Sequence, residues 1–151
     1  MSELKDRLQS DLTAAMRGRD RVTTATLRMA LAAITTEEVA GSSARELADD
    51  EVLRVLAREA KKRREAADAF GSAGRDELAA RERAEGVVLD RYLPAQLDDA
   101  AIASLVAEAI AETGATGMPQ MGAVMKVAQA KATGRADGRR LSTEVRRQLA
   151  G

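Results

Sequence analysis

The sequence contains no cysteine and no histidine. Their absence excludes disulfides and thiolate nucleophiles, and it removes the usual zinc ligands and the commonest general base near neutral pH. Aromatic residues are almost missing too, since Phe70 and Tyr92 are the only two in 151 residues. The core must therefore be aliphatic, and a composition rich in Ala, Leu, Val, Ile and Met favours helices over strands.

Long hydrophobic runs and an excess of either charge are also absent. Acidic and basic residues balance at 24 each, so attraction to a charged partner must come from how the charges are distributed. Of the two longest uncharged runs, 100–107 is too short to span a bilayer and 113–125 is broken by Gly and Pro. We therefore expect a cytoplasmic protein without a targeting segment, a membrane contact or a cofactor.

Apolar residues recur at helical spacing along the first 93 residues, beginning with Leu4, Leu8 and Leu12 after the expected N-cap Ser2. Four helices are expected there: 3–17, a second that Asp20 caps and that frays by 40–43, a third from about 49 to 70, and a fourth from about 75 to 93. Glycines in the segment 71–74 supply the backbone freedom that ends the third helix.

Pro94 disfavours helical geometry at the residue before it, so it predicts a boundary between two lobes, 1–93 and 94–151. Three shorter helices are expected in the second lobe. Asp98 should cap the first, Pro119 should begin the second, and Ser142 should cap the third. No segment alternates with a period of two, so the predicted fold is all-α, a bundle of about four helices followed by a smaller lobe of about three.

Charged side chains fall on the apolar faces of the third and fourth expected helices. At about 100° per residue, Glu59 and Arg63 lie near the centre of one face, and Glu82 and Glu85 lie on the other. We expect Arg63 to bridge to Glu82 or Glu85, with Glu59 and Arg75 nearby, because an unpaired buried charge costs several kcal/mol.

Paired glutamates could instead ligate a metal or act as acid and base. The sequence favours a structural ion-pair cluster, since no histidine accompanies the carboxylates and arginine shares the same seam. We accordingly predict neither a metal site nor a catalytic residue.

Charge is polarised along the second lobe. No Lys or Arg occurs between Pro94 and Met125, whereas residues 126–147 carry seven basic residues against two acidic ones. The predicted nucleic-acid-binding residues are Lys126, Lys131, Arg135, Arg139 and Arg140. Because Lys126 and Lys131 are about 140° apart around a helix, the tighter expected cluster is the set of three arginines.

A turn is predicted to hold these arginines together. Gly134 permits a helix exit, Asp137 with Gly138 favours a tight turn, and Ser142 is expected to begin a helix whose first N–H groups face the same loop. Guanidinium groups match phosphate oxygens, so a nucleic-acid backbone is the expected ligand. The alternative is a surface turn whose arginines are merely solvated, and both interpretations fit the same residues.

Four segments, 4–34, 61–85, 89–99 and 121–142, resemble the GatB/YqeY family in their order and spacing. The last reads MGAVMKVAQAKATGRADGRRLS. The resemblance implies an all-helical protein of two lobes, similar to the helical and tail region of the B subunit of glutamine-dependent aminoacyl-tRNA amidotransferase. That tail is thought to contact tRNA, which the resemblance carries over to Lys126, Gly134, Arg135, Asp137 and Gly138.

The resemblance leaves three functions open. The first is a tRNA-associated accessory module without catalysis of its own, whose partners are tRNA and proteins of the amidotransferase or aminoacyl-tRNA synthetase type. The second is a component of a carbon–nitrogen ligase with glutamine as amido-N-donor, active only with partner subunits, because the chain shows no counterpart of the phosphorylating domain or of an amidase serine site. The third is a helical protein–protein adaptor that uses the exposed faces of the first two helices.

Overall fold

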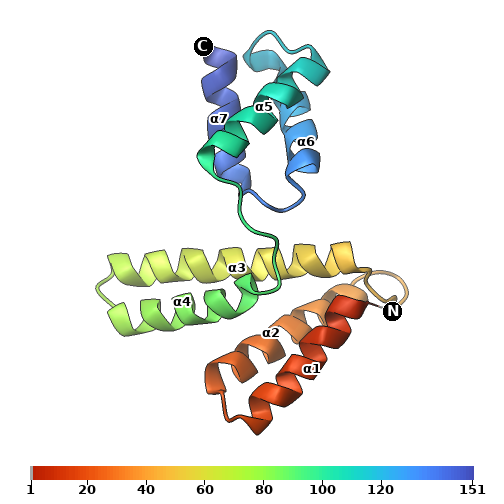
Figure 1. Ribbon diagram of the computed structural model, residues 1–151, viewed down its shortest axis with the longest axis vertical. Helices are drawn as coiled ribbons and strands as arrows, with labels where there is room; N and C mark the ends of the chain where they lie inside the picture. The colour runs from red at the N-terminus through yellow and green to blue at the C-terminus, as the bar shows by residue number, and fades with distance from the viewer. Residues whose placement is uncertain (1) are drawn as a thin grey trace. The chain divides into compact units, whose positions relative to one another are not determined.

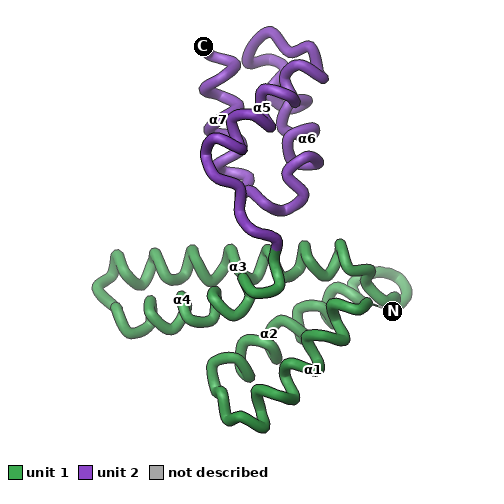
Figure 2. The backbone as a smooth tube through the Cα atoms, in the orientation of Figure 1, with its two compact units in different colours: residues 1–93 green, residues 94–151 purple. Residues whose placement is uncertain are grey.

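The computed structural model describes residues 2–151 and is all-α within that range, as predicted. The first four helices are α1 (Glu3–Arg17), α2 (Arg21–Glu38), α3 (Asp49–Ser72) and α4 (Asp76–Asp90). After them come α5 (Asp99–Thr113), the short 3₁₀ helix η1 (Met118–Gln120), α6 (Met121–Ala132) and α7 (Gly138–Ala150) (Figure 1). The chain divides into two compact units, Met1–Leu93 and Pro94–Gly151 (Figure 2). Each unit is built around its own aliphatic core.

Unit 1 consists of two antiparallel helical hairpins, α1 with α2 and α3 with α4 (Figure 1). The second helix packs against both helices of the other hairpin. The apolar stripes predicted from the sequence meet in this core, which includes Leu8, Leu27, Ile34, Leu56 and Leu89.

Side chains cap the starts of three helices at the predicted residues. Ser2, Asp20 and Asp98 each accept a hydrogen bond from the backbone N–H three residues later, at 3.0, 3.1 and 2.8 Å. The third helix begins at Asp49 itself, whose carboxylate accepts from the Ser2 hydroxyl and from the Leu4 amide (3.2 Å). The Ser2 bond lowers the pKa of Asp49. These contacts join the start of α3 to the start of α1.

A buried carboxylate fixes the loop between α2 and α3. Glu38 accepts hydrogen bonds from the Lys5 ammonium (2.9 Å) and from the Leu47 amide (3.3 Å). The Lys5 hydrogen bond lowers the pKa of Glu38. A lowered folded-state pKa means that this carboxylate stabilises unit 1 above its unfolded-state pKa, and that the contribution disappears as the pH falls through the folded-state value.

Unit 2 is a three-helix arrangement in which α5, α6 and α7 contact one another pairwise. Its core consists of Ile102, Val106, Ala109, Val124, Ala128, Ala132, Leu141 and Val145. Gly114 ends α5 in the left-handed conformation (φ 66°), and Pro119 lies in the 3₁₀ turn that leads into α6. This helix ends through two left-handed residues, Thr133 (φ 47°) and the predicted Gly134 (φ 77°).

The predicted start of the last helix was wrong by five residues. Its N-cap is Asp137, whose carboxylate accepts from the Arg139 amide at 2.8 Å, and the helix begins at Gly138. Asp137 and Gly138 therefore do not form a tight turn. Ser142 lies inside the first turns, where its hydroxyl donates to the Arg139 carbonyl (3.0 Å). Asp caps a helix at least as well as Ser, so the first of the two possible caps along the chain prevails.

Replacing Asp137 with Ala should destabilise unit 2 by about 1 kcal/mol, the usual contribution of an N-cap. The Ser142→Ala variant is the control and should stay within about 0.5 kcal/mol of the parent. Urea unfolding followed by far-UV circular dichroism measures both changes. Fluorescence of Tyr92, the only tyrosine in a chain without tryptophan, reports unit 1 and should not shift. A larger loss from Ser142→Ala would contradict the assignment of the cap.

Replacing Glu38 with Gln should destabilise unit 1 by about 2 kcal/mol at about pH 7, because a hydrogen-bonded charge pair is lost. The difference from the parent should shrink as the pH falls below about 4. The neighbouring Glu37→Gln variant removes only a surface pair with Arg58 (3.4 Å) and should change stability little. Urea titrations monitored by Tyr92 fluorescence across this pH range test the expectation, which fails if the two variants behave alike.

Candidate functional site

The turn between α6 and α7 is held by backbone contacts to the start of unit 2. The Arg135 amide donates to the Ala132 carbonyl (2.9 Å), and the Arg135 carbonyl accepts from the Leu97 amide (2.8 Å). The Arg135 side chain donates through Nε to the Ala95 carbonyl (3.1 Å). One edge of this exposed guanidinium is therefore used, while its Nη groups make no hydrogen bond within residues 2–151.

The outer face of α7 carries four arginines in two stripes. Arg139 and Arg146 are seven residues apart, and so are Arg140 and Arg147. Seven residues make about two helical turns, so the two members of each stripe point the same way to within about 20° and lie about 10 Å apart along the axis. The buried side of the helix carries Leu141 and Val145.

Only one of these two stripes is paired with carboxylates. Arg140 contacts Asp99 at 2.9 Å, and Arg147 contacts Glu144 at 2.5 Å. The bond from Arg147 is the main reason why the pKa of Glu144 is lowered. By contrast, the side chains of Arg139 and Arg146 form no ion pair anywhere in the described chain.

The remaining carboxylates of unit 2 are committed elsewhere. Asp98 and Asp137 cap helices, while Glu108 and Glu112 pair with Lys131 at 3.6 and 2.6 Å. The hydrogen bond from Lys131 to Glu112 is the largest cause of the raised pKa of that lysine. None of these carboxylates forms an ion pair with Arg139 or Arg146 within the part of unit 2 that the structure describes.

The two lysines that were predicted to bind nucleic acid lie on α6 and border one hollow, which none of the α7 arginines lines. Lys126 and Lys131 both border a shallow hollow of 430 Å³ between α5 and α6, which Glu112 also lines. Because Lys131 is held by two glutamates, its charge is already compensated. Lys126 is exposed and makes no ion pair among residues 2–151. The five cations that were predicted to act together are therefore separated into two groups in the structure.

Arg63 of unit 1 lies among three glutamates on the seam between α3 and α4. Its Nη2 is 3.4 Å from Glu59, and its Nε is 3.8 Å from Glu82 and 3.4 Å from Glu85. The arginine side chain is only 15% exposed. The position that a metal would need among these carboxylates is thus taken by a guanidinium group.

The hydrogen bonding inside this cluster is incomplete. Arg63 Nε and Glu82 Oε2 are buried and have no hydrogen-bond partner, so their attraction is coulombic. Arg75, which the sequence grouped with the cluster, is exposed and makes no ion pair with any described residue. It is the N-cap residue of α4, about two helical turns before Glu82 and nearly three before Glu85.

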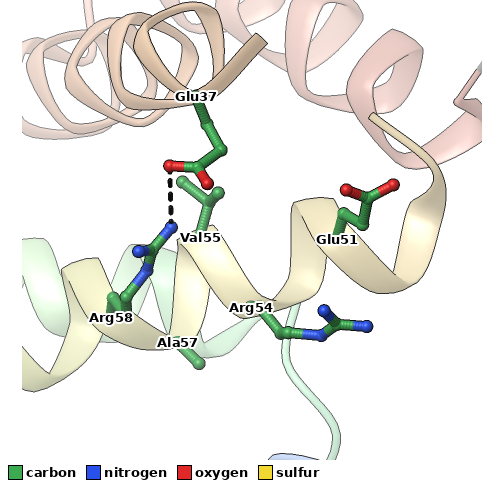
Figure 3. Close-up of a pocket in the computed structure, with 6 residues that line it drawn as sticks. All are labelled: Glu37, Glu51, Arg54, Val55, Ala57 and Arg58. Carbon is green, nitrogen blue, oxygen red and sulfur yellow. Dashed lines mark hydrogen bonds and ion pairs between the residues drawn. The ribbon is translucent and has the colours of Figure 1, made fainter. Parts of the chain in front are cut away.

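A second hollow of 430 Å³ lies between α2 and α3 (Figure 3). The buried Val55 forms part of its wall, and Glu37 and Arg58 face each other across it at 3.4 Å. Its other charged residues, Glu51 and Arg54, are paired with residues outside the hollow. None of the predicted site residues lines it.

No group of three or more acidic side chains is arranged to hold a metal ion in the described chain. Among residues 2–151, no helix combines the length and the apolar character needed to cross a bilayer.

A comparison with protein-family models finds a match over most of the chain. The family model described as YqeY-like protein covers residues 5–149. The chain belongs to the YqeY-like family. No curated protein matches the chain.

In this YqeY-like protein, sequence reasoning missed one residue of the exposed arginine stripe. Arg146 was counted in the charge balance but was not named as a site residue, because a wrong helix start placed the emphasis on a loop. The signal was present: with Asp137 as the cap, the seven-residue spacing from Arg139 to Arg146 puts both on one face.

Replacing Arg63 with Met should destabilise unit 1 by about 3 kcal/mol or more, because it leaves three crowded carboxylates without their shared cation. The control is Arg81→Met, which removes a 72% exposed arginine lying 3.8 Å from Glu85 and should change stability by less than about 1 kcal/mol. Urea unfolding monitored by Tyr92 fluorescence gives both values. Equal effects of the two substitutions would show that the cluster contributes no more than a surface pair.

Proposed function

We propose that this YqeY-like protein is an RNA-binding accessory module that contacts tRNA through unit 2 and has no catalysis of its own. The observation that carries the proposal is the stripe of Arg139 and Arg146, exposed on α7 and unpaired in a unit whose carboxylates are otherwise engaged. Family membership and the resemblance to the amidotransferase tail favour tRNA over other polyanions.

Length and chemistry suit the stripe to a phosphate backbone. Its two guanidinium groups lie about 10 Å apart along the helix, far enough to meet two phosphates of one strand. Each guanidinium can donate two parallel hydrogen bonds to phosphate oxygens. Arg135, in the turn that precedes the helix, extends the same positive surface with its unused Nη groups.

Arg140 can join this contact at small cost. Its carboxylate partner Asp99 is 100% exposed, and Arg140 itself is 38% exposed. Such surface pairs contribute at most about 1 kcal/mol, so a phosphate can replace the carboxylate. The proposed contact therefore comprises four arginines, Arg135, Arg139, Arg140 and Arg146.

The proposed recognition depends on charge and shape more than on bases. The Asp137 carboxylate occupies one amide at the start of α7 and places a negative charge there, so the proposed contact rests on side chains. Base stacking needs exposed aromatic rings, and the two aromatics, Phe70 and Tyr92, both belong to unit 1.

The double variant Arg139→Gln with Arg146→Gln should bind fluorescently labelled bulk tRNA at least about tenfold more weakly than the parent. With about four phosphate contacts, parent affinity should fall roughly 100-fold between 50 and 200 mM salt, and the variant should lose about two units of that log–log slope. Fluorescence anisotropy at several salt concentrations measures both quantities.

A matched double variant, Arg64→Gln with Arg81→Gln, removes the same charge from exposed positions of unit 1. It should change affinity less than about threefold. The proposal fails if the α7 variant binds like the parent, or if both double variants lose the same affinity. In the second case, binding would follow total charge and not the stripe.

A further inference from the structure

Unit 1 contains a hollow of 320 Å³ that none of the predicted site residues lines. Its walls come from α1, from the start of α2 and from the residues that follow α4. Two carboxylates and two guanidinium groups surround it, belonging to Asp11, Asp20, Arg7 and Arg91, together with the ring of Tyr92. The hydrogen bonds among these groups engage the carboxylates and leave guanidinium donors open to a ligand.

Both carboxylates of the hollow are committed to internal hydrogen bonds. Asp11 accepts from the Tyr92 hydroxyl at 2.6 Å. Asp20 caps α2 by accepting from the amide and the hydroxyl of Thr23, at 3.1 and 2.7 Å. The hydroxyl bond is the main cause of the lowered pKa of Asp20, which the charge of Arg91 lowers further.

The two guanidinium groups are much less committed. Arg91 makes no side-chain hydrogen bond or ion pair within residues 2–151. Arg7 lies over the Tyr92 ring, 4.8 Å from its centroid, and forms an ion pair with Asp11 at 3.9 Å that is too long for a hydrogen bond. The hollow therefore has more unused donors than acceptors, and the unused donors are cationic.

Tyr92 forms an uncharged wall for this site. Burial, followed by the hydrogen bond to Asp11, raises the pKa of Tyr92 to about 12. The phenol stays protonated near neutral pH, so it places no negative charge beside an incoming anion. Its hydroxyl donates to Asp11 Oδ2, the same oxygen that Arg7 Nε approaches to 3.9 Å.

We propose that this hollow is a phosphate-binding site in which Arg7 and Arg91 hold the oxyanion from two sides. Inorganic phosphate or a phosphate monoester has at least three terminal oxygens and can accept from both guanidinium groups at once, whereas a carboxylate has two oxygens. The volume of 320 Å³ accommodates the phosphate together with part of the molecule that carries it. The carrier is either a small phosphate monoester, which has three terminal oxygens, or a nucleic-acid strand, whose phosphodiesters have two non-bridging oxygens.

The site lies in unit 1 and uses none of the arginines of α7. This proposal can therefore fail while the proposed function holds, and the reverse is also true. Its test is a titration of the full chain, labelled with ¹⁵N, in which inorganic phosphate is added at constant ionic strength against chloride. The Nε–H signals of Arg7 and Arg91 should move saturably. The signal of Arg64, an exposed and unpaired arginine of α3, should stay in place.

Two substitutions with opposite effects sharpen the test. Arg91→Gln, at an exposed residue beyond the end of α4, should weaken phosphate binding about tenfold. Asp11→Asn removes a negative charge from the hollow but keeps an acceptor for Tyr92, so it should strengthen binding roughly threefold. A purely structural role for these residues would not produce an increase in affinity.

A single-stranded oligonucleotide, titrated in parallel, identifies the source of the phosphate. Saturable shifts of Arg7 and Arg91 with inorganic phosphate alone indicate a site for small phosphate esters, and shifts with the oligonucleotide alone indicate a nucleic-acid contact. The proposal is overturned if neither ligand moves these two signals, if Arg64 moves equally, or if Asp11→Asn and Arg91→Gln bind phosphate like the parent.

Discussion

The pairing of each carboxylate with a particular cation determines which positive charges of this protein remain open to a ligand. The chain has equal numbers of acidic and basic residues, so a uniform distribution would leave no attractive surface. Instead, unit 2 directs its acids to Lys131, Arg140, Arg147 and two helix caps. Of the charge that remains, Arg139 and Arg146 lie on one face of α7, Arg135 lies in the turn before it, and Lys126 lies on α6. Net neutrality is thus compatible with strong local polarity, because compensation is local and selective.

The same constraint has a different result inside unit 1. On the seam between α3 and α4, three glutamates surround Arg63, whose side chain is mostly removed from water. Here the charges pair with one another inside the protein, and two buried polar atoms have no hydrogen bond. Such a cluster specifies how two helices align more than it strengthens their packing, since desolvation offsets much of the attraction. Carboxylate-rich seams in helical proteins can bind metals, and this one differs because arginine supplies the cation.

Much of the fold follows from the sequence because helix periodicity and capping are local. The stripe through Leu4, Leu8 and Leu12, the caps Ser2, Asp20 and Asp98, and the glycine at 114 all act within a few residues of their own position. The candidate site was harder to predict from the sequence, since it depends on contacts between residues that are far apart along the chain. Nothing local indicates that Glu112 takes Lys131 or that Asp99 reaches Arg140 across 41 positions. The start of α7 was misplaced because Asp137 and Ser142 are both competent caps, and that shift hid the register of Arg146.

The side-chain bond from Arg135 to the carbonyl of Ala95 links the basic turn to the chain segment that enters unit 2 from Leu93. Nε holds this carbonyl while the Nη groups stay open, so Arg135 can meet a phosphate without giving up its bond to residue 95. The Leu97 amide contact to the same residue (2.8 Å) and the packing of the Leu97 side chain on the core of unit 2 fasten the entering segment further. A ligand held at the turn would therefore be tied directly to the segment through which the chain enters unit 2.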